Sequence, residues 1–164
     1  MQIEKTMSFS GHRGLPEGRD LELLQKRAEE VIDTAIQEGY TTFLVGGAVG
    51  WDMLCGELLI RRKTRFALPW KRKKITVICV VPFAGQDSRY ATKDRSRYAS
   101  LLRNCDHVVT LNPRYTDGCY KERNQYMVDR SSRIITYYDG DFRSGTGQTV
   151  RMAERKGLEI INLY

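Results

Sequence analysis

The sequence is poor in cysteine and histidine, and it has no long apolar run. No stretch approaches the ~20 consecutive apolar residues of a transmembrane helix, and the first residues lack the apolar core of a signal peptide. We therefore expect a cytoplasmic protein without a membrane partner. The two histidines lie far apart, and the four cysteines, Cys55, Cys79, Cys105 and Cys119, form no Cys-x-x-Cys pair. These features speak against a disulfide framework and against a bound metal or a required cofactor.

The common nucleotide-binding fingerprints are also missing. A P-loop needs a Lys after its last glycine, and none follows Gly50. The order of Gly46, Gly47 and Gly50 also differs from the Gly-x-Gly-x-x-Gly turn of dinucleotide-binding proteins. The chain has instead an apolar β-type run, 41–45, that ends in these glycines directly before a helical pattern. Such a turn exposes backbone N–H groups that suit phosphate, and a tight turn without a ligand is the alternative.

Strand and helix patterns alternate along the whole chain. The expected strands cover residues 5–9, 41–45, 75–81, 107–111, 133–138 and 159–163, and helical patterns lie between them. The first helix is expected to begin at Asp20 as N-cap and to end at Gly39. This alternation predicts an α/β, Rossmann-like, doubly wound three-layer sandwich with a mostly parallel, roughly six-stranded sheet. The length fits a single domain over residues 1–164.

Chemically capable residues gather where the expected strands end. Ligands of doubly wound sheets bind beyond the carboxyl ends of the strands, at the point where the strand order reverses. The opposite loops are ordinary connectors. The residues that follow the strands are Gly11, His12, Arg13, Gly46, Gly47, Gly50, Asp52, Pro82, Gln86, Tyr115, Tyr138 and Asp139, with Arg123, Asn124 and 144–149 on the later helices.

A basic stretch contributes much of the net charge of +7. Residues 61–74 contain no acid, and Phe66 and Trp70 lie among the basic residues. Basic and aromatic residues together are typical of a nucleic-acid or anion surface. We favour the alternative, a solvated helix end and loop whose cations complement the helix dipole.

These motifs resemble the YpsA-like branch of the SLOG superfamily, Rossmann-type proteins proposed to bind nucleotide-derived ligands. The resemblance covers nearly the whole chain, and its motifs occur in the order of that branch. The matching segments are Gly11-His12-Arg13, 46–52, Pro82 with Gln86, Arg123-Asn124 with 127–129, and Ser144-Gly145-Thr146.

The superfamily is also similar to the lonely-guy phosphoribohydrolases, which cleave the N-glycosidic bond of nucleoside monophosphates. Arg123 falls on their catalytic arginine, but Thr149 falls on their catalytic glutamate. A hydroxyl cannot replace a carboxylate as general acid or base, so this departure argues against that chemistry. A second departure is Ser144, which stands where the branch has glycine and resists a positive φ.

The resemblance implies a ligand-binding role for a set of rim residues. Backbone N–H groups of the glycine turns would hold phosphate, Arg123 would pair with it, and Asp52 would accept from a ribose hydroxyl. Structural alternatives are an ion pair for Arg123, a helix-start carboxylate for Asp52 and a hydrogen-bonded residue for His12, which could also act as a general base. The expected ligand-binding residues are Gly11, His12, Arg13, Gly46, Gly47, Gly50, Asp52, Pro82, Gln86, Arg123, Asn124, Ser144, Gly145, Thr146 and Thr149.

We therefore expect a protein that binds or senses a nucleotide or nucleotide-derived ligand of the ADP-ribose or NAD class. The alternatives are a hydrolase of a nucleotide glycosidic or phosphate bond, and a nucleic-acid-binding protein that uses residues 61–74, as in the related DNA-processing protein A. A homodimer and a protein partner are further expectations, which no residue pattern specifies.

Overall fold

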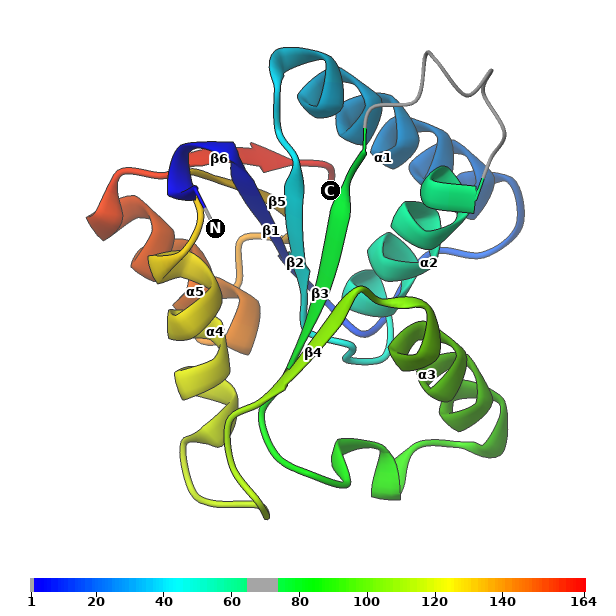
Figure 1. Cartoon of the computed structure of the whole chain (residues 1–164), viewed down its shortest axis with the longest axis vertical. Helices are drawn as coiled ribbons and strands as arrows, with labels where there is room; N and C mark the ends of the chain where they lie inside the picture. The colour runs from blue at the N-terminus through cyan, green and yellow to red at the C-terminus, as the bar shows by residue number, and fades with distance from the viewer. Residues whose placement is uncertain (1, 65–73) are drawn as a thin grey trace.

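A sheet of parallel strands forms the centre of the molecule, in a computed structural model that describes residues 2–64 and 74–164 (Figure 1). The strand order is β4-β3-β2-β1-β5-β6, and every neighbouring pair is parallel. The strands are β1 (Thr6–Gly11), β2 (Thr42–Val45), β3 (Thr76–Val81), β4 (His107–Thr110), β5 (Arg133–Tyr137) and β6 (Glu159–Asn162). The expected α/β, Rossmann-like sheet is confirmed.

Helices cover both faces of this sheet. The described helices are α1 (Gly18–Glu38), α2 (Trp51–Thr64), α3 (Thr92–Asn104), α4 (Cys119–Asp129) and α5 (Gly145–Lys156), with short 3-10 helices η1 (Ile3–Lys5) and η3 (Gln86–Arg89). Helices α1, α2 and α3 lie on one side, and α4 and α5 pack together on the other (Figure 1). Within the described residues, no helix has the length and apolar character needed to cross a bilayer.

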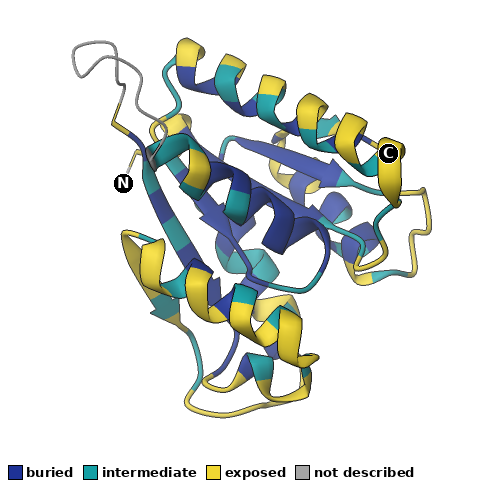
Figure 2. Ribbon diagram, turned by 90° about the vertical axis from the view of Figure 1, so that its right-hand side faces the viewer, coloured by how far each residue is buried: buried dark blue, intermediate teal, exposed yellow. Residues whose placement is uncertain are grey.

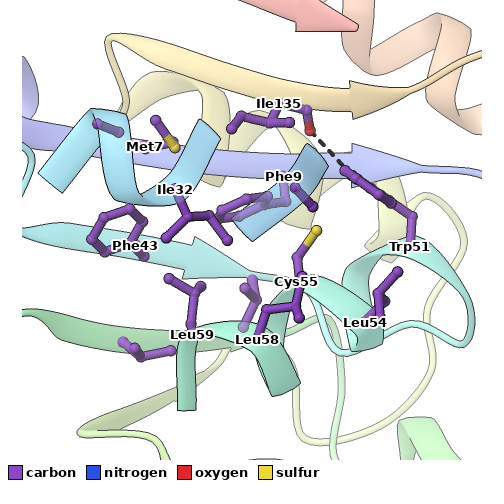
Figure 3. Packing of buried hydrophobic residues seen from close by; sticks show 14 of the residues in the cluster. Met7, Phe9, Ile32, Phe43, Trp51, Leu54, Cys55, Leu58, Leu59 and Ile135 are labelled. Atoms are coloured by element: carbon purple, nitrogen blue, oxygen red, sulfur yellow. Dashed lines mark hydrogen bonds between the residues drawn. The ribbon is translucent and has the colours of Figure 1, made fainter. Parts of the chain in front are cut away.

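The main core lies between the sheet and the layer of α1 and α2. Met7, Phe9 and Phe43 point from β1 and β2 toward Ile32 and Leu59 on the helices, and all five are almost completely buried (Figure 3). The inner strands are dark blue in Figure 2, because helices cover both of their faces. The packing of this core therefore fixes the position of the carboxyl end of β1 relative to that of β2.

The helix and strand ends differ in part from the sequence-based prediction. The prediction that Asp20 caps the first helix is wrong: α1 begins at Gly18, with Glu17 at the N-cap and Asp20 inside the first turn. The acid still favours the helix, because it lies at the positive end of the dipole. Gly39 ends α1 as predicted, with a φ of 105°. Strand β1 runs on to Gly11, because Gly11 pairs with Tyr137 of β5.

The order of the strands reverses between β1 and β5, so the chain after β1 lies at the switch point of the sheet. Trp51, the first residue of α2, crosses beside this point and donates from Nε1 to the carbonyl of Ile135 at 3.3 Å (Figure 3). A Cβ on Gly11 would overlap the Trp51 ring. The glycine therefore lets α2 begin close against β1.

Candidate functional site

A cavity of about 330 Å³ lies at the switch point, beyond the carboxyl end of β1. Its walls come from the end of β1 and the loop after it, the start of α2, α4 and the N-terminus of α5. It is lined by Ser10, Gly11, His12, Arg13, Ala48, Asp52, Tyr120, Arg123, Asn124, Ser144, Gly145 and Thr146. The structure thus brings together most of the residues that the sequence analysis selected.

The glycine turn after β2 is held from behind by side chains. The carbonyl of Gly46 accepts hydrogen bonds from Arg123 Nη1 at 2.6 Å and from Gln86 Nε2 at 3.2 Å. The carbonyl of Gly47 accepts from the Tyr90 hydroxyl at 3.3 Å. Across the described part of the chain, no acceptor bonds the N–H groups of Gly47 and Ala48. The turn therefore uses its carbonyls for structure, and the N–H of Ala48, which lines the cavity, is left without a protein acceptor in the described residues.

Two charged groups are buried together beside this turn. Arg123 is 5% exposed and Asp52 6%, and their Nη1 and Oδ2 atoms lie 3.8 Å apart. Burial raises the pKa of Asp52 to about 6, although Arg123 and a hydrogen bond from the Gly46 backbone favour the charged carboxylate. Arg123 also donates from Nε to Asn124 Oδ1 at 2.7 Å. Its Nη2 has no protein acceptor among residues 2–64 and 74–164.

Arg13 is the more exposed cation of the cavity. No acid or carbonyl in the described ranges pairs with its guanidinium. The backbone of Arg13 packs on the turn before α2, because Gly50 approaches it so closely that a Cβ would overlap Arg13. A fixed backbone and an unpaired guanidinium at a cavity wall are suited to an anionic ligand.

His12 forms a pair with Asp139 at the edge of the cavity. Its Nε2 lies 2.8 Å from Asp139 Oδ1, and the ring contacts those of Tyr137 and Tyr138. The pKa of Asp139 is lowered, mainly by a hydrogen bond from the backbone of Asp141 and further by His12. The pair orients the imidazole, which agrees with the structural alternative for His12.

Ser144 caps the helix that closes the cavity. Its φ is −67°, so the position needs no glycine, and its Oγ accepts from the Gly147 N–H at 2.9 Å. The departure from the glycine of the branch therefore meets no positive φ at this position. No acceptor in the described chain bonds the N–H groups of Gly145 and Thr146, both of which line the cavity. The N-terminus of α5 thus presents two free donors and the positive end of its dipole.

Some of the selected residues support the site without lining it. Gly46, Gly47 and Gly50 shape the turn, and the latter two have φ values of 66° and 94°. Pro82 and Gln86 follow β3, which lies two strands away from β1, and Gln86 is 2% exposed behind the turn.

Thr149 is also turned away from the cavity. It is 2% exposed, and its hydroxyl donates back to the carbonyl of Gly145 at 3.0 Å. The position of the lonely-guy glutamate is therefore filled here by a side chain that bonds within its own helix.

Ser10, Ala48 and Tyr120 line the cavity but were missed in the sequence analysis. Ser10 directly precedes the Gly11-His12-Arg13 motif, and Ala48 lies inside the glycine turn. Tyr120 is four residues before Asn124 on α4, a spacing that places two side chains on one helix face. This spacing was the signal that could have found it.

The basic stretch 61–74 is described only at its ends, and residues 65–73 lie outside the described residues. Arg62 pairs with Asp33, and Lys63 lies 2.8 Å from Asp106. The described part is therefore tied to neighbouring elements by ion pairs. Among the residues described, no group of three or more His, Cys, Asp or Glu side chains is arranged to hold a metal ion.

Curated relatives cover most of the chain at low identity. UPF0398 protein BH1768 from Halalkalibacterium halodurans is 25% identical over 140 residues, which are 84% of this chain and 71% of the relative. The SPbeta prophage-derived protein YoqJ from Bacillus subtilis is 25% identical over 151 residues, 84% of each chain.

Solved structures share the fold. DNA processing protein A from Streptococcus pneumoniae superposes with a TM-score of 0.68 at 18% identity over 97% of this chain, which spans only 50% of that protein. DNA processing protein A from Helicobacter pylori, from a study of its single-stranded DNA binding mode, superposes with a TM-score of 0.64 at 16% identity. The match covers 98% of this chain and 65% of that protein. TM1055 gives 0.57 at 16% identity over 95% of this chain and 72% of TM1055.

The sequence model of the YpsA family, described as the YspA SLOG family, matches residues 16–160. That range includes the glycine turn, Arg123 and the start of α5. The chain therefore belongs to the YspA SLOG family.

Proposed function

We propose that the cavity binds a nucleotide or nucleotide-derived ligand and that this binding is the function of the protein. The observation that carries the proposal is the convergence of Arg13, Arg123 and the free N–H groups of α5 on one cavity of about 330 Å³. Positive charge and directed N–H donors in one hollow are suited to a phosphate group. Asp52 lines the same cavity and is suited to accept from a ribose hydroxyl.

The finer form of the proposal is a ligand of the ADP-ribose or NAD class. Its diphosphate would use two separate sets of donors, one at the α5 N-terminus and one at Ala48 with Arg13. The pair of donor sets supports a diphosphate over a single phosphate. Ligand binding would change the association of the protein with a protein partner or with a second copy of the chain. Light scattering with and without ligand measures this change in association.

A thermal-shift screen of AMP, ADP, ADP-ribose and NAD tests the proposal. A ligand at about a hundred times its dissociation constant adds ~2.7 kcal/mol of stability. Arg13→Ala should weaken binding about tenfold, because it removes a charge-assisted contact of ~1.5 kcal/mol. Arg155→Ala is the matched control, since it removes the same charge from the last turn of α5. Absence of any shift, or equal weakening by both variants, contradicts the proposal.

Hydrolysis is the rival outcome of the same screen. Release of a free base, ribose phosphate or phosphate from the nucleotides would assign an enzymatic function to the cavity. Thr149 argues against the lonely-guy reaction, because it is bonded to its own helix and lies outside the cavity wall.

A second candidate function is binding of single-stranded DNA. It is favoured by the net charge of +7 and by the fold shared with DNA processing protein A. Oligonucleotide affinity that falls steeply with salt concentration would support it. Affinity that is equally weak at low and high salt would contradict the binding of single-stranded DNA as a function.

A further inference from the structure

The outer face of α4 carries a row of polar and charged side chains that is separate from the nucleotide cavity. Lys121, Gln125 and Asp129 follow one another at intervals of four residues and therefore lie in line along the helix. Together with Glu122 they help to line a hollow of about 450 Å³ on the surface of α4. None of these four residues lines the nucleotide cavity. Helix α4 thus has one face for the cavity and another that is open to a second molecule.

The charges at the two ends of this row are placed against the dipole of α4. Lys121 lies in the first turn, at the positive end of the helix, and Asp129 is the last residue, at the negative end. Both are exposed, and Lys121 has no acidic partner among the residues described. Asp129 accepts a hydrogen bond from Gln125 Nε2 at 2.8 Å, and no cation in residues 2–64 and 74–164 pairs with it. Neither charge favours α4 alone, so a partner that pairs with both would account for their placement.

An apolar part of the sheet lies beside this face. Of the described helices, three cover one face of the sheet and only α4 and α5 cover the other, so β3 and the edge strand β4 are least covered on the side of α4 (Figure 1). Ile78, Leu111 and Tyr126 pack against the buried side chains of Val80 and Met127 there, but they stay only half-buried. Apolar side chains that remain partly exposed beside a charged rim are typical of a protein–protein contact.

The charge pattern matches a second copy of the same chain. If two α4 helices pack antiparallel about a two-fold axis at Gln125, Lys121 of each copy lies opposite Asp129 of the partner subunit. Glu122 and Arg130 have the same spacing as Lys121 and Asp129, so Glu122 lies opposite Arg130 of the partner subunit. Both rows are therefore complementary to themselves. Parallel packing would instead place like charges opposite each other.

We propose that the protein forms a two-fold symmetric homodimer through α4 and the adjacent face of β3 and β4, with the two α4 helices antiparallel. The second copy covers the half-buried apolar side chains, which supplies the affinity, while the ion pairs set the orientation of the helices. The same helix carries Arg123 to the nucleotide cavity, so the interface supports one wall of the site. The dimer does not depend on a nucleotide, and its test is separate from that of the proposed function.

Charge reversal tests the antiparallel pairing. In sedimentation equilibrium, Lys121→Glu and Asp129→Lys should each raise the dissociation constant of the dimer about tenfold, because each change turns two attractive pairs into two repulsive ones. The double variant Lys121→Glu/Asp129→Lys exchanges the charges and should restore wild-type association. Each reversal also suits the dipole of α4, so the variants should stay folded. Lys93→Glu, the same reversal in the first turn of α3, is the matched control and should leave association unchanged.

A cysteine on the two-fold axis gives a second, independent measurement. Gln125→Cys places a thiol of each copy next to that of the other, so mild oxidation should link the two chains covalently. Ser100→Cys, at an exposed position on α3, and the wild type should show no such link. A wild type that stays monomeric up to millimolar concentration, single reversals that leave the dimer unchanged, or a double variant that is not restored would overturn the proposal. None of these results bears on nucleotide binding.

Discussion

Arg123 Nη1 donates a 2.6 Å hydrogen bond to the carbonyl of Gly46, which lies 77 positions earlier in the chain. The bond joins α4 to the turn that follows β2, beyond the carboxyl ends of the strands. The same guanidinium lies 3.8 Å from the buried carboxylate of Asp52. One side chain thus fixes the glycine turn and compensates a buried charge, while its Nη2 has no acceptor within the described residues.

Arg123→Ala should therefore lower both stability and ligand binding. Asp52 would be left buried without its cation, and loss of one partner of a buried pair costs about 3 kcal/mol or more of unfolding free energy. Urea denaturation measures this loss, and thermal shift with a nucleotide measures binding. Arg155→Ala, which removes an arginine far from the cavity, should change neither by much. Equal stability of the two variants would contradict the role assigned to Arg123.

The sheet and the rim of the site were predictable from local patterns. The apolar run of β3 and the glycine stop at Gly39 each depend on a few neighbouring residues, and both agree with the structure. The residues at the rim of the site were predictable because the carboxyl ends of parallel strands lie at one edge of the sheet. These features require no knowledge of which side chain faces which.

The direction of individual side chains could not be predicted in this way. Gln86 and Thr149 both follow strands at the correct edge, but Gln86 turns back to the Gly46 carbonyl and Thr149 bonds to its own helix. Tyr120 reaches the cavity because α4 lies beside β1, which is a long-range property. The N-cap of α1 was missed because Asp20 favours the first turn as well as the cap.

The ionisation of Asp52 should make stability depend on pH. Its pKa is about 6 in the folded protein against an ordinary value of 3.8, so the folded state binds the proton more tightly. The contribution is complete below about pH 4 and is lost as pH rises through 6, a change of about 3 kcal/mol. In Asp52→Asn this fall in unfolding free energy should disappear. Urea denaturation between pH 4 and pH 8 measures it, with the exposed Asp117→Asn as control. An unchanged pH dependence in Asp52→Asn would contradict the burial of the charge.

Ser144→Ala should destabilise α5 by about 1 kcal/mol, because the Gly147 N–H loses the side chain that caps it. Ser144→Gly should cost only a few tenths of a kcal/mol, since glycine is tolerated at the N-cap. Urea denaturation and hydrogen exchange at Gly147 are the measurements. Ser100→Ala, on the exposed face of α3, is the control and should be close to neutral. If Ser144→Ala and Ser100→Ala were equally stable, the cap would contribute nothing measurable.

Two glycines at the site should respond to alanine in opposite ways. A Cβ on Gly46 would overlap the Arg123 guanidinium and the Asp52 carboxylate, so Gly46→Ala should lower the unfolding free energy by about 1–3 kcal/mol and weaken nucleotide binding. A Cβ on Gly145 would meet nothing within 4 Å, and its φ is not positive. Gly145→Ala should therefore keep or slightly raise stability, as alanine favours the helix. Its methyl group would nevertheless lie at the donors proposed for phosphate, so nucleotide affinity should fall at least several-fold. Urea denaturation and calorimetric titration separate the two effects, and undiminished affinity in a stable Gly145→Ala variant would show that the anion does not approach the start of α5.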